Sequence, residues 1–345
     1  MRFKHWHTVF LALLAVAFTV ALTYASLALP QIASTAVLDV LGPAGETIDY
    51  STGLSEEFLS SYHIRMIGAL SLLSIVILVG VGLFTERRRW AAAGAVAVFL
   101  PVFGHFALDM SMLAGLGLLR VVWLPIIDHY PDLLRLGHVA LVPYLVTVYV
   151  PALAGIDLRV PLIHGLLGAG ILLFTAGTFA WFRARFQGRS IAHRGIYRFS
   201  RHPQYLGWIV WSYGLMIYVA RLRGPRIQWS VESTLPWLAA TLILVCVALK
   251  EEISMRSKPQ DDYREYLSHT PFLFPVPKVI SRIVSAPMRL SIRKRWPATR
   301  GDVAIVFVVY AGLLILMSLP FVLLDWPHSA QAILHAFPYN VPPFR

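Results

Sequence analysis

Repeated apolar runs of about 20 residues are the feature that most restricts what this chain can fold into, because that length of helix crosses the hydrocarbon core of a bilayer. Backbone groups find no water in hydrocarbon, so a spanning segment must be a helix or part of a closed barrel. The 345 residues are 57% hydrophobic and 14% charged, whereas soluble domains carry about a quarter charged residues. The sequence therefore predicts an all-α, polytopic integral membrane helical bundle.

The apolar runs predict eight membrane-spanning helices, and the charges between them indicate a ninth. The predicted spans are residues 8–29, 64–84, 90–109, 136–155, 161–182, 204–221, 234–250 and 302–324. Lys and Arg are enriched in cytoplasmic loops, and the basic segments 85–90 and 183–202 lie on one side only if 111–127 also crosses. We therefore favour nine spans over eight, with a cytoplasmic N-terminus and a retained first helix rather than a cleaved signal peptide.

The basic residues point to a membrane surface as their partner. A formal net charge of +12 would indicate nucleic acid for a soluble protein, but here the cations flank apolar spans, which predicts anionic lipids and no nucleic acid. Residues 278–296 alternate apolar side chains with Arg and Lys, as is typical of a helix in the membrane interface. We expect this helix on the cytoplasmic leaflet, broken or kinked at Pro287.

These features divide the chain into four regions. Residues 1–159 form an N-terminal transmembrane region without an assigned role, and residues 160–278 form a membrane core with polar loops. Residues 279–300 are the basic amphipathic segment, and residues 301–345 hold the final transmembrane helix and the C-terminal tail.

Histidines within the predicted spans raise the question of a metal or haem site. His105 and Asp109 lie one helical turn apart, and His138 and His164 lie in later spans. Such a site needs convergent ligands, and no repeated spacing indicates that they converge. The single cysteine, Cys246, suggests no thiolate site and allows no intrachain disulfide. We expect no metal; interhelical hydrogen bonds account for the histidines, with the lining of an acceptor cavity as the alternative.

Two polar motifs flank the two apolar runs of the core. "RHPQY" at 201–205 and "KEEIS" at 250–254 are separated by enough residues for a helical hairpin, which returns the chain to the same membrane surface. Adjacent carboxylates at the C-terminal end of a helix oppose its dipole, so a compensating cation is expected. That cation is either a neighbouring side chain, from Lys250, Arg256 or the preceding arginines, or a ligand with an ammonium or sulfonium group.

The sequences "GIYRFSRHPQYLGWIVWSYG" (195–214) and "KEEISMRSKPQDDYREYLSHTPFLFP" (250–275) resemble the core of the isoprenylcysteine carboxyl methyltransferase family. That family lies within a wider group of membrane methyltransferases that includes phospholipid N-methyltransferases. The resemblance covers residues 190–278, and no counterpart is recognised for the first 160 residues or the last span. The matching positions are Arg201, His202, Pro203, Tyr205, Gly207, Glu251, Glu252, Tyr263, Tyr266 and Pro275.

The resemblance implies a methyltransferase-like core that binds S-adenosylmethionine on the cytoplasmic side and takes a lipophilic or lipidated acceptor from the bilayer. The implied cofactor-binding residues are His202, Pro203, Tyr205, Gly207, Glu251, Glu252, Tyr263 and Tyr266. The implied catalytic residues are Arg201 and Arg264, which would bind a carboxylate of the cofactor or acceptor, and Glu252, which could act as a base.

Several of these residues have a second interpretation. Gly207 lacks a Cβ and so permits the close approach of either a ligand or another helix. Tyr263 and Tyr266 could instead be interfacial aromatics at the headgroup level. If the cofactor assignment is correct, Glu252→Gln and His202→Ala should each abolish cofactor binding while the protein stays folded.

Two other classes of function compete with the methyltransferase. A membrane reductase of the sterol-reductase type shares a histidine-proline-x-tyrosine helix start and would use NADPH instead. A transporter or scaffold would bind neither cofactor, and its expected mark is a pair of discontinuous helices at matching positions in two halves of the chain. The glutamate pair and "RHPQYLGW" favour the methyl donor.

Overall fold

The computed structural model describes residues 5–41, 66–67, 69–70, 73, 122–189, 191–221, 234–256 and 261–324. All regular structure in these segments is helical, which confirms the all-α prediction. The predicted span 90–109, nearly all of span 64–84 and segment 111–121 lie outside the described residues, so the total number of spans stays a prediction.

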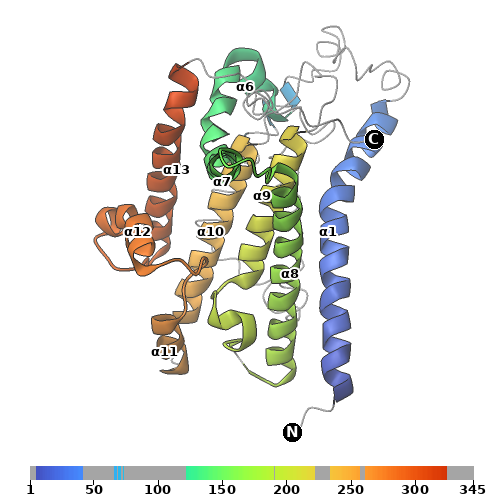
Figure 1. Cartoon of the computed structure of the whole chain (residues 1–345), viewed down its shortest axis with the longest axis vertical. Coiled ribbons are helices and arrows are strands. Elements are labelled where there is room, and N and C mark those ends of the chain that lie inside the picture. The colour runs from blue at the N-terminus through green and yellow to red at the C-terminus, as the bar shows by residue number, and fades with distance from the viewer. Residues whose placement is uncertain are drawn as a thin grey trace.

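The described elements form a bundle of long helices flanked by short ones (Figure 1). Helices α8, α9, α10 and α13 run side by side, and α1 packs on the outer side of α8. The elements are α1 (His5–Leu41), α6 (Leu124–His129), η3 (Pro131–Leu141), α7 (Val142–Ala152), α8 (Arg159–Phe186), η4 (Gly195–Arg198), α9 (Pro203–Arg221), α10 (Thr234–Arg256), α11 (Asp261–His269), α12 (Lys278–Ile292) and α13 (Arg300–Leu323).

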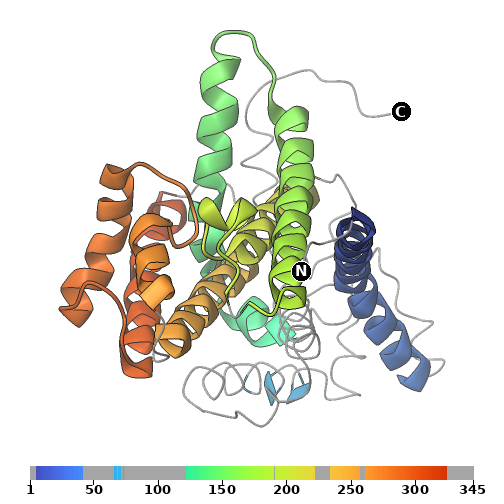
Figure 2. The ribbon, with the colours of Figure 1, turned by 90° about the horizontal axis from the view of Figure 1, so that it is seen from below.

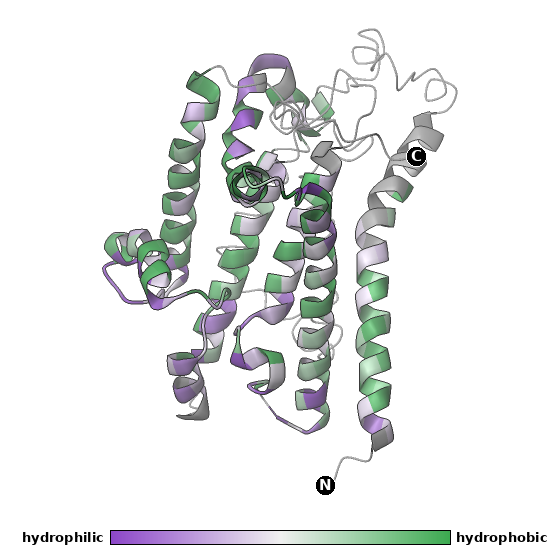
Figure 3. Ribbon diagram, viewed as in Figure 1, coloured by the Kyte–Doolittle hydropathy of each residue, from purple (hydrophilic) through white to green (hydrophobic). Residues whose placement is uncertain are grey.

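Four stretches of the described chain are long and apolar enough to cross a membrane, which supports a polytopic membrane protein. They are Trp6–Tyr24, Asp132–Ala152, Arg159–Phe186 and Arg300–Leu323. Figure 3 shows apolar residues around much of α1, α8 and α13. Helices α9 and α10 form where spans 204–221 and 234–250 were predicted, and their inner faces supply much of the core.

The structure adds detail to two of the predicted helices. The stretch Asp132–Ala152, which corresponds to predicted span 136–155, is helical throughout, but it changes from the 3-10 helix η3 to the α-helix α7 at Val142. Pro143 lies in the first turn of α7, where its missing N–H costs no hydrogen bond. Helix α12 is not broken at Pro287, because it continues to Ile292, and the hydroxyl of Tyr310 in α13 donates to the carbonyl of Val284, three residues before the proline.

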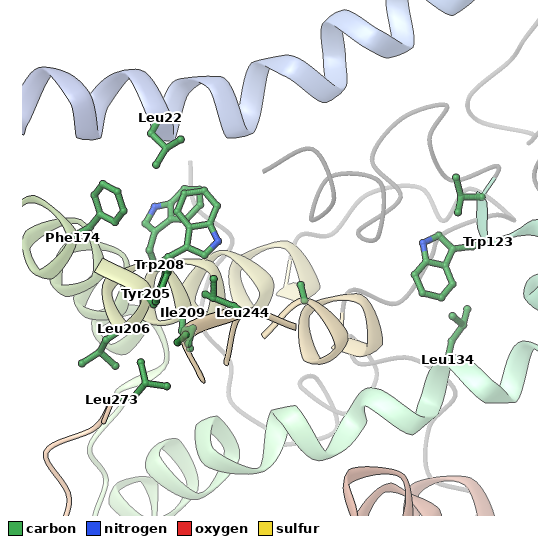
Figure 4. Close-up of a cluster of buried hydrophobic side chains, with 14 residues drawn as sticks. Leu22, Trp123, Leu134, Phe174, Tyr205, Leu206, Trp208, Ile209, Leu244 and Leu273 are labelled. Atoms are coloured by element: carbon green, nitrogen blue, oxygen red, sulfur yellow. The ribbon is translucent and has the colours of Figure 1, made fainter. Parts of the chain in front are cut away.

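The core forms where α1, α8, α9 and α10 meet (Figure 4). Trp208 of α9 is buried together with Phe174 of α8, Leu22 of α1 and Leu244 of α10. A hydrogen bond of 3.0 Å from Thr175 to the Thr19 hydroxyl oxygen also joins α8 to α1. This packing fixes the position of α9, whose first residues carry the polar motif.

Glycines allow α8 and α9 to approach closely. A Cβ at Gly170 of α8 would lie 2.4 Å from the backbone nitrogen of Trp211, and a Cβ at Gly207 of α9 would lie 2.5 Å from the backbone nitrogen of Phe174. Real Cβ atoms do not come this close to backbone, so neither position accepts a side chain without moving a helix. Of the two roles considered for Gly207, the structure shows helix contact.

Gly170→Ala should therefore destabilise the bundle, because overpacking of a tight contact costs about 1–3 kcal/mol. The matched control is Gly168→Ala on the same helix, where a Cβ would meet nothing within 4 Å and where alanine favours the helix by about 1 kcal/mol. The midpoint of thermal unfolding in detergent should fall for the first variant and hold or rise for the second. Equal midpoints would contradict the close packing of α8 on α9.

Candidate functional site where α9 begins and α10 ends

The polar motif before α9 is held in place by backbone and side-chain hydrogen bonds. The backbone N–H of Arg201 donates to the carbonyl of Pro271 at 2.9 Å, and the N–H of His202 donates to the Ser200 hydroxyl oxygen at 3.2 Å. Helix α9 then begins at Pro203, where proline is tolerated because a first-turn N–H has no helical partner. These contacts aim Arg201 and His202 at the end of α10.

A buried carboxylate joins the two motifs. Glu252 of α10 has no exposed side-chain surface, and its Oε2 accepts hydrogen bonds from Arg201 Nη1 and Arg256 Nη2, both at 3.1 Å. His202 Nε2 lies 3.4 Å from the other oxygen, Oε1. The predicted meeting of "RHPQY" and "KEEIS" is confirmed, and neighbouring arginines supply the compensating charge of Glu252.

The adjacent carboxylate has a different environment. The side chain of Glu251 keeps 39% of its surface exposed, and its Oε1 accepts a 2.5 Å hydrogen bond from the Tyr205 hydroxyl. Its Oε2 lies 3.8 Å from His202 Nδ1. Loss of hydration at this packed end of the bundle raises the pKa of Glu251, while His202 and the hydrogen bond from Tyr205 oppose that rise. Glu251 is therefore the carboxylate that an incoming ligand can reach.

Aromatic rings cover the two arginines. The Arg201 guanidinium lies 5.1 Å from the Trp296 ring centroid and 5.6 Å from that of Phe272, and the Arg256 guanidinium lies 5.2 Å from Trp296. These are cation–π distances. Trp296 lies in the segment between α12 and α13, and sequence reasoning missed it because that segment reads as part of an interfacial helix. Its only signal is a lone tryptophan directly after three basic residues.

Two buried donors at this site, Arg201 Nε and Trp296 Nε1, have no hydrogen-bond partner among the described residues. Glu252 Oε1 and His202 Nε2 also miss strict hydrogen-bond geometry, but they lie 3.4 Å from each other, and Arg201 Nη1 lies 3.0 Å from the same Oε1. Buried polar atoms are nearly always hydrogen-bonded, so a cluster of exceptions needs an explanation, such as a ligand. These donors belong to the cluster around Glu252, next to the partly exposed carboxylate of Glu251, which makes this region the strongest candidate for a binding site in the described chain.

The tyrosines of α11 complete one side of the site. Tyr263 is buried, its hydroxyl lies 3.8 Å from the Met255 sulfur, and burial raises its pKa to about 12. The Tyr266 hydroxyl donates to the Tyr197 carbonyl at 2.9 Å, which ties α11 to η4. Burial within the protein makes Tyr263 unsuited to the alternative role at the headgroup level. The side chain of Arg264 lies outside what the structure describes, so its predicted role stays a prediction.

The histidines in the apolar helices make ordinary hydrogen bonds. His138 Nδ1 lies 3.2 Å from the Thr234 hydroxyl oxygen and so links η3 to α10, as predicted for interhelical bonding. The prediction was wrong for His164, whose Nδ1 lies 3.0 Å from the Val160 carbonyl one turn earlier in the same helix, α8. Across the segments that the structure describes, no group of three or more His, Cys, Asp or Glu residues could hold a metal ion. His105 and Asp109 lie outside these segments.

Comparison with known proteins gives one partial match. A family described as "Protein of unknown function (DUF1295)" matches residues 177–270, from within α8 to the end of α11. This family of uncharacterised proteins belongs to a membrane group similar to the steroid 5α-reductases. The match includes Arg201, His202, Glu251 and Glu252 but ends before Phe272 and Trp296. No curated protein and no solved structure matches the chain.

Glu252→Gln should destabilise the protein even without a ligand, since two arginines would lose a buried carboxylate and such losses cost about 3–5 kcal/mol. The sequence alone led us to expect that Glu252→Gln would leave the protein folded, and the buried ion pairs of Glu252 change that expectation. Glu251→Gln is the matched control, because that side chain is partly exposed and its loss should cost less than about 1 kcal/mol. Thermal unfolding in one detergent compares the two variants, and an equal midpoint for both would refute the structural role of Glu252.

Proposed function

We propose that this chain is an integral membrane methyltransferase that uses S-adenosylmethionine and methylates a lipophilic acceptor from the bilayer. The proposal rests on one observation: the site contains both hydrogen-bond donors without a partner and carboxylates. Arg201 Nε and Trp296 Nε1 are donors without a partner among the described residues. Trp296 lies over the two arginines that bind Glu252, and Glu251 directly precedes Glu252 in the chain. A zwitterionic α-amino acid, which is one end of this cofactor, needs both kinds of partner.

The residues present fit that end of the cofactor. Glu251 would hold the ammonium group, because it is the carboxylate with exposed surface. Arg201 Nε and Trp296 Nε1 would donate to the cofactor carboxylate, and a guanidinium suits that shape. Tyr263 and Phe272 supply aromatic surface for the adenine ring. Glu252 would act indirectly in this arrangement, by holding Arg201 in place.

The chemistry asks mainly for alignment. When bound, the cofactor supplies a methyl group whose bond to sulfur breaks as its bond to the acceptor forms. The protein must hold donor and acceptor in line and exclude water, and such alignment can supply much of a rate enhancement. A carboxylate acceptor, as in an isoprenylcysteine, is already ionised and needs no base, whereas an amine must first lose a proton. His202, next to both glutamates, is the group that could take it.

The basic loop before α9 indicates on which side of the membrane the cofactor site lies. Residues 183–202 contain six arginines and no acidic residue, and the positive-inside tendency places such a loop in the cytoplasm. The site adjoins this loop, because Arg201 and His202 are its last residues. We therefore place the cofactor site on the cytoplasmic side, where S-adenosylmethionine is available.

A membrane reductase that uses NADPH is the second candidate. The reductase-like group of the matching family favours it, and so do exposed cations at Arg183, Arg185, Arg194 and Arg198, which could bind phosphates. However, the candidate site at the end of α10 contains the carboxylate of Glu251, which is partly exposed and would repel a phosphate. The carboxylates therefore favour the methyl donor.

Titration calorimetry of the full-length protein in lipid nanodiscs tests whether the site binds S-adenosylmethionine or NADPH. We expect S-adenosylmethionine to bind and NADPH not to bind. Glu251→Gln should weaken binding about 10- to 100-fold, the equivalent of about 1.5–3 kcal/mol for a hydrogen bond to a charged group. The control is Glu265→Gln, an exposed glutamate of α11, which should bind like the parent. Binding of NADPH alone, or unchanged affinity in Glu251→Gln, would overturn the proposal.

Trp296→Phe tests the residue that sequence reasoning missed. Phenylalanine keeps one aromatic ring beside the arginines but removes the N–H together with one ring of the indole, so the unfolding midpoint is measured as well to report the lost packing. Affinity for S-adenosylmethionine should fall about 5- to 10-fold, because the carboxylate loses one donor worth about 1 kcal/mol. Unchanged affinity for S-adenosylmethionine would show that Trp296 does not contribute to the site.

The acceptor can be identified separately, by transfer of a tritiated methyl group from S-adenosylmethionine to membrane lipid extracts.

A further inference from the structure

Helix α12 presents an apolar face that no described part of the chain covers. Val279, Ile280, Ile283, Val284 and Leu290 form this α12 apolar face and are 47–79% exposed. Their spacing puts them on one side of a helix. Met288 and Ile292, on another side, are buried against Val303 and Val306 of α13. The helix is thus fixed to the bundle by one side and leaves its apolar face outward.

The sequence around this face is uniformly basic. Residues 270–301 contain seven Lys and Arg residues and no acid: Lys278, Arg282, Arg289, Arg293, Lys294, Arg295 and Arg300. Lys294 pairs with Asp302 at 2.9 Å, and Arg289 bonds within the helix to the Ser285 hydroxyl and the Arg282 carbonyl. Arg282 and Arg295 are exposed. Charge complementarity therefore selects an anionic occupant.

The position of α12 identifies that occupant as a membrane surface. The segment after α12 is tied to the start of α13 by a capping box between Thr299 and Asp302, and α13 is one of the helices able to cross a bilayer. In Figures 1 and 2, α12 lies across the direction of α13 rather than along it. A basic, crosswise helix at the end of a span lies at the depth where hydrocarbon gives way to headgroups.

We infer that α12 docks on a leaflet of anionic phospholipids, with its apolar face among the acyl chains and Arg282 and Arg295 at the headgroup phosphates. The site does not depend on the proposed methyl transfer, because none of these side chains contacts Glu251 or Glu252. The ligand is the lipid bilayer itself rather than a soluble phosphate, since the apolar face and the cations must be satisfied together.

Fluorescence quenching in nanodiscs tests this arrangement. The only natural cysteine is buried, so a fluorophore can be attached selectively to Ile283→Cys or, as a matched control, to Ser281→Cys, an exposed position near the start of α12 that lies outside the apolar face. Nitroxide groups on lipid acyl chains should quench the label at 283 several-fold more than the label at 281. Equal quenching at both positions, or a label at 283 shielded from lipid by a second copy of the chain, would overturn the inference.

The preference for anionic lipid is measured separately. With trace nitroxide lipids in 50 mM salt, the anionic lipid should quench the label at 283 at least twofold more than its zwitterionic counterpart. This ratio should fall towards one in 500 mM salt, which screens the charges, and in the double variant Arg282→Gln, Arg295→Gln. The control double variant Arg183→Gln, Arg198→Gln has the same net charge and should keep the ratio. A ratio near one at low salt would refute the anionic preference even if no variant folds.

Discussion

The buried carboxylate of Glu252 is the interaction on which the rest of the site depends. It joins Arg201, just before α9, to Arg256, in the last turn of α10. An unpaired charge in a buried position is very unfavourable, so each of these groups constrains the others. The same contact leaves Arg201 beneath Trp296 and Phe272 and brings His202 between the two glutamates. One ion-pair cluster thus arranges residues from three separate stretches of the chain.

The two neighbouring glutamates consequently differ in role. Glu252 already has two guanidinium partners, whereas Glu251 has a tyrosine hydroxyl and exposed surface. A ligand with an ammonium group would gain most from Glu251, and unpartnered donors nearby suit a carboxylate on the same ligand. This mixture of charges is the physical basis for preferring an amino-acid-bearing cofactor to a nucleotide phosphate. The exposed arginines between residues 183 and 198 are the basis of the alternative proposal, a reductase that binds the phosphates of NADPH.

The C-terminal part of the chain belongs to the site although the family match ends at residue 270. Phe272 and Trp296 lie beyond that limit, and both contact Arg201. Trp296 also connects the site to α12 and α13, because Lys294 and Thr299 on either side of it are bound to Asp302. Helices α12 and α13 and the candidate site are therefore parts of one packed unit.

Hydropathy was enough to predict the helical bundle and helices α8, α9, α10 and α13, because apolar runs are local in the sequence. The return of "KEEIS" to "RHPQY" was predictable from the length of the intervening chain, which fits two helices and a turn. Spacing alone left open which of Glu251 and Glu252 holds a ligand, and whether Gly207 faces a ligand or a helix. It also gave Trp296 no role. Tertiary structure decided these points, since burial of a carboxylate, the backbone of α8 over Gly207 and the stacking of Trp296 on Arg201 all arise from contacts between segments distant in sequence. Local pattern determines which segments are helices, and only packing determines which side chains remain open to a ligand.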